Sequence, residues 1–269
     1  MKTRTLTYCA AFALLAGLAA CTDVELDEPG VNADNLTTLS GDFSRTLVVG
    51  DFLYGVDNES VLTYDITDRA APSLVDRTPV GLAVETIYHH EGNLFIGSRS
   101  GMYIYAISRS GVPVRRGDYQ YSDLPGIDEV QPCDPVVAEG NTAYASVYTS
   151  DDATDGCGRV NTFQNIVVLD VSNLDRPSVV NLQPASTPRG LAIDGDLLFV
   201  CNNENGMTVY DVTDRTEFQW VAHFGDVNAW DAIAGDGRLV VVAADEVVQY
   251  DYTDPANIVE LSRVDLPQL

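Results

Sequence analysis

Short apolar runs separated by polar turn residues recur along the chain after residue 43, and one unit shows the pattern most clearly. Residues 190–193 and 197–201 are apolar runs, residues 207–212 alternate between apolar and polar side chains, and 218–224 form a further short run. Runs of four to eight residues rich in β-branched and aromatic side chains, bounded by Gly, Asn and Asp, indicate strands. This unit therefore predicts a four-stranded antiparallel sheet.

The end of the third predicted strand carries a five-residue phrase that returns five times. The phrases begin at Tyr64, Tyr105, Leu169, Tyr210 and Tyr250, and their starts lie 40–41 residues apart except for one interval of 64. A period of about 40 residues with four strands in each unit is typical of a propeller blade, and the long interval indicates an insertion. We therefore predict an all-β fold without helices, a β-propeller of five four-stranded blades. The predicted blades cover residues 44–80, 82–121, 130–185, 187–226 and 228–266, and residues 35–40 are the only spare candidate for a closing strand.

Turn residues fit this reading. A two-residue turn that contains one glycine separates the first and second strands of every unit. These turns are Gly50-Asp51, Glu91-Gly92, Glu139-Gly140, Asp194-Gly195 and Asp236-Gly237. We interpret them as type I′ hairpins, whose two central residues need positive φ. Pro72, Pro113 and Pro177 each precede the predicted outer strand, where a residue without an N–H is tolerated at a sheet edge.

The pattern of the first 43 residues predicts an export signal followed by a tether, and no part of the folded domain. Lys2 and Arg4 precede an apolar run at 8–15, which is typical of a signal peptide over residues 1–20, and the run is too short to span a bilayer. Leu18-Ala19-Ala20-Cys21 resembles the lipobox of bacterial lipoproteins, which implies lipidation at Cys21; the alternative is an ordinary secretory signal followed by a chance cysteine. In lipoproteins of this kind, an Asp directly after the lipidated cysteine retains the protein in the inner membrane. This chain has Thr22 at that position, so the resemblance implies delivery to the outer membrane. Residues 21–43 are acidic and poor in apolar side chains, and we expect a disordered tether before a propeller domain at 44–269.

The charge of the chain limits its partners. Its 40 acidic residues against 15 basic ones give a formal net charge of −25. Such a surface repels phosphate backbones and anionic lipids, so nucleic acid is excluded as a partner and the membrane is expected only through the lipid anchor. Cations suit this charge, although solubility alone explains it. We expect a monomer.

The third unit carries a family resemblance. The strand Ile166-Val167-Val168-Leu169-Asp170, with Val171-Ser172-Asn173 and Arg176-Pro177 after it, resembles the LVIVD-repeat family of exported propeller proteins. The resemblance covers all five units and implies an extracytoplasmic propeller. It implies no catalytic motif. The second unit departs most, because Ala106 and Arg109 replace the recurrent acidic or amide residues.

One end of the predicted propeller carries long loops. In a propeller, the links between blades share one face with the loops that join second and third strands, and here the link at 121–133 and the loop at 149–164 are extended. Long loops on a minimal repeat usually carry function. Cys133 and Cys157 lie in these segments, and we predict a disulfide between them, which an exported location permits; the alternative is two free thiols. Cys201 is interpreted as a buried strand residue.

Alignment of the inner strands on their turn glycines predicts a ring of side chains at the channel mouth. It places Thr86, Asp134, Arg189 and Asp231 at equivalent positions, with Glu85, Cys133, Pro188 and Trp230 one residue earlier. The candidate ligand-binding residues are Glu85, Asp134, Arg189, Trp230 and Asp231. They suit a small polar ligand or a cation. The alternative is structural, with Arg189 neutralising the carboxylates and Trp230 packing between blades.

Familiar catalytic and metal motifs are absent or incomplete. His90-Glu91 lacks the second histidine of a zinc protease, and Arg99 stands where the nucleophile of a Gly-x-Ser-x-Gly elbow belongs. The segment 151–156 resembles the start of a calcium loop, but Ala153 replaces an oxygen ligand. We therefore predict no catalytic residue, no metal ligand and no cofactor.

Three functions follow from these observations. The leading one is a membrane-anchored binding module of the bacterial cell envelope that recognises a protein, a glycan or a small ligand through its elaborated face. The second is a hydrolase or lyase that uses Glu85, Asp134 and Asp231, with or without a divalent cation. The third is a structural spacer.

Overall fold

The computed structural model describes residues 46–81, 83–125, 135–148 and 163–267, and all of them belong to one compact unit, Thr37–Leu269. Twenty strands form five separate four-stranded antiparallel sheets. In each sheet the strands follow one another in chain order, so each sheet is a meander and forms one blade. The predicted fold, an all-β propeller of five four-stranded blades, is confirmed.

The strands are as follows. Blade 1 comprises β1 (Thr46–Val49), β2 (Phe52–Val56), β3 (Ser60–Asp65) and β4 (Ser73–Pro79). Blade 2 comprises β5 (Val84–His90), β6 (Asn93–Ser98), β7 (Gly101–Ile107) and β8 (Pro113–Gln120). Blade 3 comprises β9 (Val136–Glu139), β10 (Thr142–Tyr148), β11 (Gln164–Asp170) and β12 (Ser178–Pro184). Blade 4 comprises β13 (Leu191–Asp194), β14 (Leu197–Cys201), β15 (Met207–Asp211) and β16 (Gln219–Phe224). Blade 5 comprises β17 (Ala229–Gly235), β18 (Arg238–Ala243), β19 (Glu246–Asp251) and β20 (Val259–Asp265).

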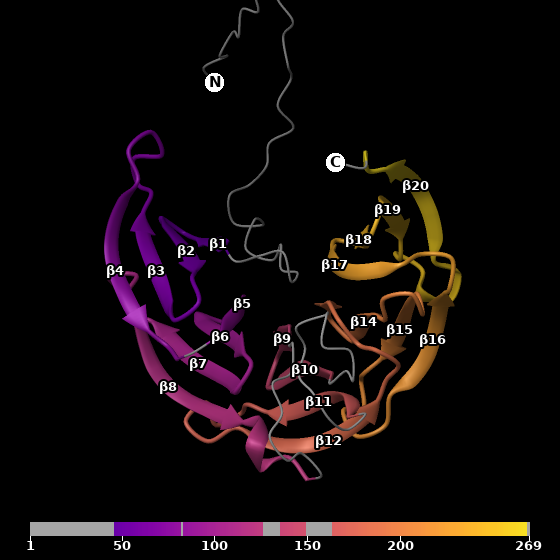
Figure 1. The fold of residues 1–269 in the computed structure, drawn as a ribbon, viewed down its shortest axis with the longest axis horizontal. Coiled ribbons are helices and arrows are strands. Elements are labelled where there is room, and N and C mark those ends of the chain that lie inside the picture. The colour runs from indigo at the N-terminus through magenta and orange to yellow at the C-terminus, as the bar shows by residue number, and fades with distance from the viewer. Residues whose placement is uncertain (1–45, 82, 126–134, 149–162, 268–269) are drawn as a thin grey trace, which may run out of the picture. The chain divides into compact units, whose positions relative to one another are not determined.

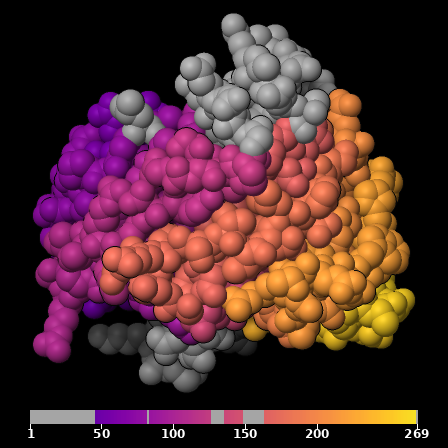
Figure 2. All heavy atoms as spheres, turned by 90° about the horizontal axis from the view of Figure 1, so that it is seen from below, coloured from indigo at the N-terminus to yellow at the C-terminus, as the bar shows by residue number. Residues whose placement is uncertain are grey.

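The blades are arranged in a ring with their first strands near the centre and their fourth strands at the rim (Figure 1). The inner strands pack in order, β1 on β5, β5 on β9, β9 on β13 and β13 on β17. The outer strands of blades 2, 3 and 4 form successive bands across one side of the molecule (Figure 2). No α-helix occurs in the described ranges, which contain only two short 3-10 turns, η2 (Tyr121–Asp123) and η3 (Pro255–Asn257).

The hydrophobic core lies between neighbouring blades. Alternate side chains point to opposite sides of a strand, and blades 2, 3 and 4 each have a neighbouring blade on both sides. These sheets therefore have apolar residues on both faces. In blade 4, Leu198 packs with residues of blade 3, whereas Phe199 packs with residues of blade 5. The core of the protein is therefore a series of interblade layers and not one central cluster.

The first and last blades do not meet as the other neighbours do. Within the described residues β1 and β17 lack the packing that joins every other pair of consecutive inner strands, and Figure 1 shows an opening between blade 1 and blade 5. Blades 1 and 5 therefore each have one face with no blade against it.

The inner hairpins use two kinds of turn, which corrects the prediction that all of them are type I′. Glu91 and Gly92 in blade 2 both have positive φ, as do Asp236 and Gly237 in blade 5, which fits type I′. In blades 1, 3 and 4 only a glycine has positive φ, and the strand pairing puts it first in the two-residue loop. Glycine at the first position is typical of type II′. The turn pairs of blades 3 and 4 are thus Gly140-Asn141 and Gly195-Asp196, and not Glu139-Gly140 and Asp194-Gly195 as predicted.

The recurrent phrase closes the third strand of blades 1, 3, 4 and 5 with a local hydrogen bond. Asp65, Asp170, Asp211 and Asp251 each accept the backbone N–H two residues later through Oδ1. These turns direct the chain toward the outer strand. Blade 2 has Ala106 at this position and cannot make the bond. Pro113 begins β8, and Pro72 and Pro177 immediately precede β4 and β12, so the predicted position of proline at the outer strand is confirmed.

Candidate functional site

Strand pairing corrects the predicted alignment of the channel-mouth residues. The last paired residues before the inner turns are His90, Asp194 and Gly235. Counting back from them makes Glu85, Arg189 and Trp230 equivalent, and Thr86, Gly190 and Asp231 equivalent. Arg189 therefore belongs with Glu85 and not with Asp231. The glycine alignment was wrong because the turn glycine occupies the first loop position in blade 4 and the second in blades 2 and 5.

Glu85 and Trp230 lie at irregularities of their inner strands. The pairing of β5 skips from Val84 to Thr86, and that of β17 skips from Ala229 to Asp231. The skipped residue is a β-bulge, a device that changes the direction of a side chain near the end of a strand. Both residues lie at the end of the inner strand where the chain arrives from the preceding blade.

Glu85 forms an ion pair within its own blade. Its Oε1 accepts a hydrogen bond from Nε of Arg99, in the turn between β6 and β7, at 2.8 Å. Both side chains are partly exposed, so the pair contributes little to stability. Glu85 is therefore paired with Arg99 and not with Arg189, the partner that the structural alternative predicted.

Arg189, Trp230 and Asp231 are brought together by the contact between blades 4 and 5. The N–H of Gly190 donates to the carbonyl oxygen of Trp230 at 2.9 Å, and a Cβ at Gly190 would lie 2.4 Å from Oδ1 of Asp231. Only glycine therefore allows this approach. Asp231 is 2% exposed, and its Oδ1 accepts the N–H of Ala232. Trp230 is 41% exposed and does not fill an interblade layer.

Arg189 is held by its main chain. Its N–H donates to the carbonyl oxygen of Cys201 at 2.7 Å, and its own carbonyl oxygen accepts a hydrogen bond from the hydroxyl of Ser146 in blade 3 at 2.6 Å. Its Nε is buried and makes no hydrogen bond to a described residue. Cys201 is a buried residue of β14, as predicted.

Other predicted site residues lie outside the described residues. Asp134 is one of them, and so are Cys133 and Cys157 of the predicted disulfide and Cys21 of the predicted lipid anchor. The disulfide and the anchor stay predictions. Within the described ranges, no cluster of three or more His, Cys, Asp or Glu side chains is arranged to hold a metal ion. In the same ranges, no helix is long and apolar enough to cross a membrane.

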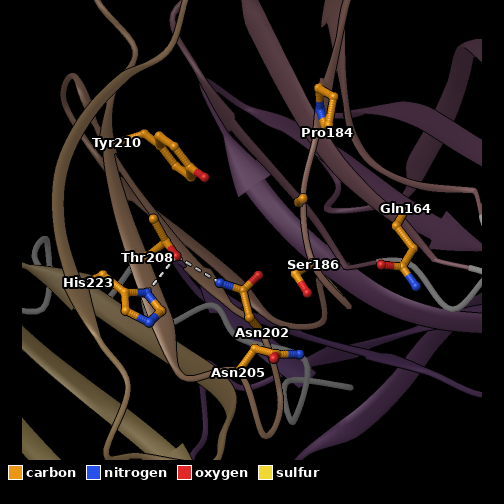
Figure 3. Close-up of a pocket in the computed structure, with 9 residues that line it drawn as sticks. Gln164, Pro184, Ser186, Asn202, Asn205, Thr208, Tyr210 and His223 are labelled. Carbon is orange, nitrogen blue, oxygen red and sulfur yellow. Dashed lines mark hydrogen bonds between the residues drawn. The ribbon is translucent and has the colours of Figure 1, made fainter.

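A polar pocket lies between blades 3 and 4, at the end of the ring that carries the long loops (Figure 3). Its volume is about 510 Å³, which is within the range of small-molecule sites. One wall comes from the start of β11 and the end of β12, and the other from the β14–β15 hairpin and from β15 and β16. The described residues that line it are Gln164, Pro184, Ala185, Ser186, Asn202, Asn205, Thr208, Tyr210 and His223.

A hydrogen-bonded chain of three side chains forms the wall from blade 4 (Figure 3). Nδ2 of Asn202 donates to Oγ1 of Thr208 at 2.9 Å, and this hydroxyl lies 3.1 Å from Nδ1 of His223. A hydroxyl has one proton. When Thr208 donates that proton to Nδ1, His223 carries its own proton on Nε2 and offers it at the exposed rim of the pocket.

Asn202 places a buried acceptor in the wall of the pocket. The side chain is 5% exposed, and with Nδ2 directed at Thr208 its Oδ1 has no hydrogen-bond partner among the described residues. A buried acceptor without a donor is unfavourable by about 1–3 kcal/mol. Tyr210 directs its hydroxyl toward the same space (Figure 3), and because burial raises the pKa of Tyr210 this hydroxyl keeps its proton at neutral pH.

The rim of the pocket holds backbone in an uncommon conformation. Thr187 and Asn203 have φ of 47° and 54°, and positive φ is strained for a β-branched residue such as threonine. Thr187 is fixed there because its N–H donates to Oε1 of Gln164 and its hydroxyl donates to the carbonyl oxygen of Asn202. Asn205 in turn donates Nδ2 to that hydroxyl. The strained rim thus ties both walls together.

The pocket offers neutral donors and acceptors. With His223 neutral, none of the nine described lining residues carries a charge, although the chain as a whole has a net charge of −25. Residues 202–206 lie between two predicted strands and in the sequence indicate only a hairpin turn, so the pocket was not predicted. The concentration of Asn in that hairpin, at the elaborated end of the ring, was the one available signal.

Comparison with known proteins supports the fold and leaves the family open. No protein-family model matches the chain, and no curated protein does. The resemblance to the LVIVD-repeat family therefore stays a prediction.

Several solved structures share the fold. A protein from Lactobacillus plantarum matches with a TM-score of 0.59 and 15% identity, over 81% of this chain and 69% of that one. A periplasmic gluconolactonase from Pseudomonas aeruginosa matches with a TM-score of 0.57 and 13% identity, over 81% and 68%. Apo AztD from Citrobacter koseri matches with a TM-score of 0.56 and 14% identity, over 81% of this chain and 59% of that one. The chain thus spans about three fifths of AztD, and identities this low show the fold alone.

Proposed function

We propose that the chain is an exported, lipid-anchored protein of the bacterial outer membrane and that it acts as a binding module through the pocket between blades 3 and 4. The ligand is a small, neutral, hydroxyl-rich molecule, of which a saccharide is the main example. The β-propeller supplies a rigid scaffold that holds the two walls of the pocket but carries no activity by itself.

The observation that carries the proposal is the unpaired Oδ1 of Asn202. An unpaired acceptor in the wall of a cavity is satisfied once a ligand O–H or N–H group reaches it, and the surrounding Tyr210 and His223 supply donors to the same ligand. Saccharide hydroxyls both donate and accept, so they match this mixture. Because no Asp, Glu, Lys or Arg is among the described lining residues, a carboxylate or phosphate ligand would lose hydration without gaining a permanent counter-charge, which disfavours it.

The envelope location rests on the first residues of the chain. Residues 1–20 have the pattern of a signal peptide, and Cys21 stands where a lipoprotein is acylated. One acyl chain holds a protein weakly, whereas two or more give stable anchoring. We expect Cys21→Ser to release the protein from the membrane fraction of expressing bacteria. A variant that stays in the membrane fraction after a carbonate wash would contradict the anchor.

The ligand class is tested on the mature chain that carries Cys21→Ser. Isothermal titration calorimetry compares glucose and galactose with glucuronate, which adds a carboxylate to the same ring. We expect binding of a neutral sugar, weaker or no binding of glucuronate, and loss of binding in Asn202→Leu.

Thr63→Val serves as a matched control for Thr208→Val, because both threonines are buried in a third strand but only Thr208 lines the pocket. Thr208→Val should weaken sugar binding and Thr63→Val should not. Equal effects of the two variants, or stronger binding of glucuronate than of both neutral sugars, would refute the proposal.

A further inference from the structure

Blade 5 has an apolar face that no blade covers. Within the described residues, its face toward blade 4 includes Leu239 and Val241, both 0% exposed. The opposite face, which we call the outer face of blade 5, consists of Ile233, Val240, Val242, Val247, Gln249 and Val264. The three central valines are partly exposed there, and Val264 is 60% exposed.

The other four blades have an aromatic ring at the centre of the equivalent face. By strand pairing, the position of Val240 is held in blades 1 to 4 by Tyr54, Phe95, Tyr144 and Phe199. Each of these rings is at most 2% exposed, because it is covered by the next blade. In blade 5 the smaller Val240 replaces the ring, and Gln249 is the cross-strand partner. The face is therefore still apolar at its centre but differs from a regular interblade face.

Blade 1 also has an apolar face that no blade covers. Its outer face consists of Val48, Leu53, Leu62, Tyr64 and Leu74, on the side of the sheet away from blade 2. Leu53 and Tyr64 are partly exposed, whereas their equivalents in blade 2, Leu94 and Tyr105, are 0% and 2% exposed. Val48 is 39% exposed and Leu74 is 56% exposed. Apolar patches of this kind on both sides of one opening indicate a surface that is covered in the functional molecule.

We propose that residues 37–45, the segment that leads into β1, pack into the opening and cover the outer faces of blades 1 and 5. The segment joins the described structure at Thr46, the first residue of the innermost strand of blade 1, so its attachment point borders the opening. A covalently attached segment has an effective concentration in the millimolar range. A second copy of the chain, by contrast, is repelled by the net charge of −25.

The composition of the N-terminal region supports this occupant. Leu39 and Phe43 lie next to β1, whereas residues 22–30 contain four acidic side chains and only two large apolar ones, Val24 and Leu26. The seven residue steps from Leu39 to Thr46 can extend over about 23 Å. This is about twice the roughly 10 Å between packed sheets, so the segment can reach across the opening.

The test uses the mature chain with Cys21→Ser and two matched double variants. Leu39→Asp with Phe43→Asp changes the proposed contact, and Val24→Asp with Leu26→Asp makes the same change of charge and polarity in the acidic part of the tether. We expect the first pair of substitutions to increase the fluorescence of bound ANS, a probe of exposed apolar surface, and to lower Tm. The control pair should change neither.

A second arm locates the contact on blade 5. Val247→Ser should increase ANS fluorescence by itself, and its effect should not add to that of the Leu39 and Phe43 substitutions, because residues in contact show coupled effects. Equal behaviour of the two tether variants would overturn the proposal. A dimer that forms with increasing concentration in light scattering, and that Val247→Ser but not the Leu39 and Phe43 substitutions dissociates, would overturn it in favour of a second copy.

Discussion

Thr63 gives a prediction whose sign is opposite to that of most core substitutions. Its side chain is 0% exposed in β3, and Oγ1 makes no hydrogen bond to a described residue. It lies opposite Tyr54 and faces blade 2. The equivalent residues of blades 2 and 4 are Ile104 and Val209, both apolar and 0% exposed. The hydroxyl therefore occupies an apolar layer with no partner.

Replacing Thr63 with valine changes this hydroxyl into a methyl group of similar size. The substitution removes an unpaired buried polar group, worth about 1–3 kcal/mol, and buries one more methyl group, worth about 0.8 kcal/mol. We expect Thr63→Val to raise the free energy of unfolding by about 2–4 kcal/mol. For a domain of this size Tm should rise by about 4–16 °C.

Thr142→Val is the matched control. Thr142 is also buried, 4% exposed, but its hydroxyl accepts a hydrogen bond from Nη1 of Arg215 at 2.7 Å. Loss of a hydrogen bond to a charged group should lower the free energy of unfolding by about 1–2 kcal/mol. Urea titration and calorimetry of both variants provide the comparison. The reasoning fails if Thr63→Val destabilises the protein as much as Thr142→Val does.

Three further predictions concern the core and the pH dependence of stability. Phe199→Ala removes a fully buried ring between blades 4 and 5, whose centroid lies 4.9 Å from the ring centroid of Tyr252. The substitution should lower the free energy of unfolding, measured by urea titration, by about 3–5 kcal/mol. Burial raises the pKa of Tyr54, Tyr144 and Tyr250 to about 12. Their neutral forms therefore stabilise the fold fully below pH 10, and this contribution should be lost as pH rises from about 10 to 12, seen as unfolding that accompanies phenolate absorbance. Hydrogen bonds from Ser172 lower the pKa of Asp170, so its contribution should be present above about pH 4 and lost as pH falls further, and Asp170→Asn should reduce this acid sensitivity.

The sequence was sufficient to predict the fold because each blade repeats the same local signals. Alternating apolar residues, a glycine turn and the Asp-containing phrase agree with one another in nearly every unit. The alignment of Arg189 failed at one point, since a glycine shows that a turn is present but not which of its two positions the glycine holds. Only the pairing of Asp194 with Leu197 settled that register.

The pocket could not be predicted for a different reason. It depends on the approach of Gln164 to Thr187 and on the burial of Asn202, and residues of two blades contribute to it. Local sequence patterns describe each blade but not how two neighbouring blades separate at one end. An asparagine in a hairpin reads as a turn former whether its side chain faces solvent or a cavity.

The outer strands share an irregularity with a consequence for molecules crowded together on a surface. In every blade the pairing of the third and fourth strands shifts by one residue, which leaves Val75, Arg116, Val180, Val221 and Leu261 unmatched. An extra residue twists a border strand away from the straight, regular row of amides that a foreign strand needs for pairing. Five such distortions around the circumference should let neighbouring molecules collide without stacking into fibrils.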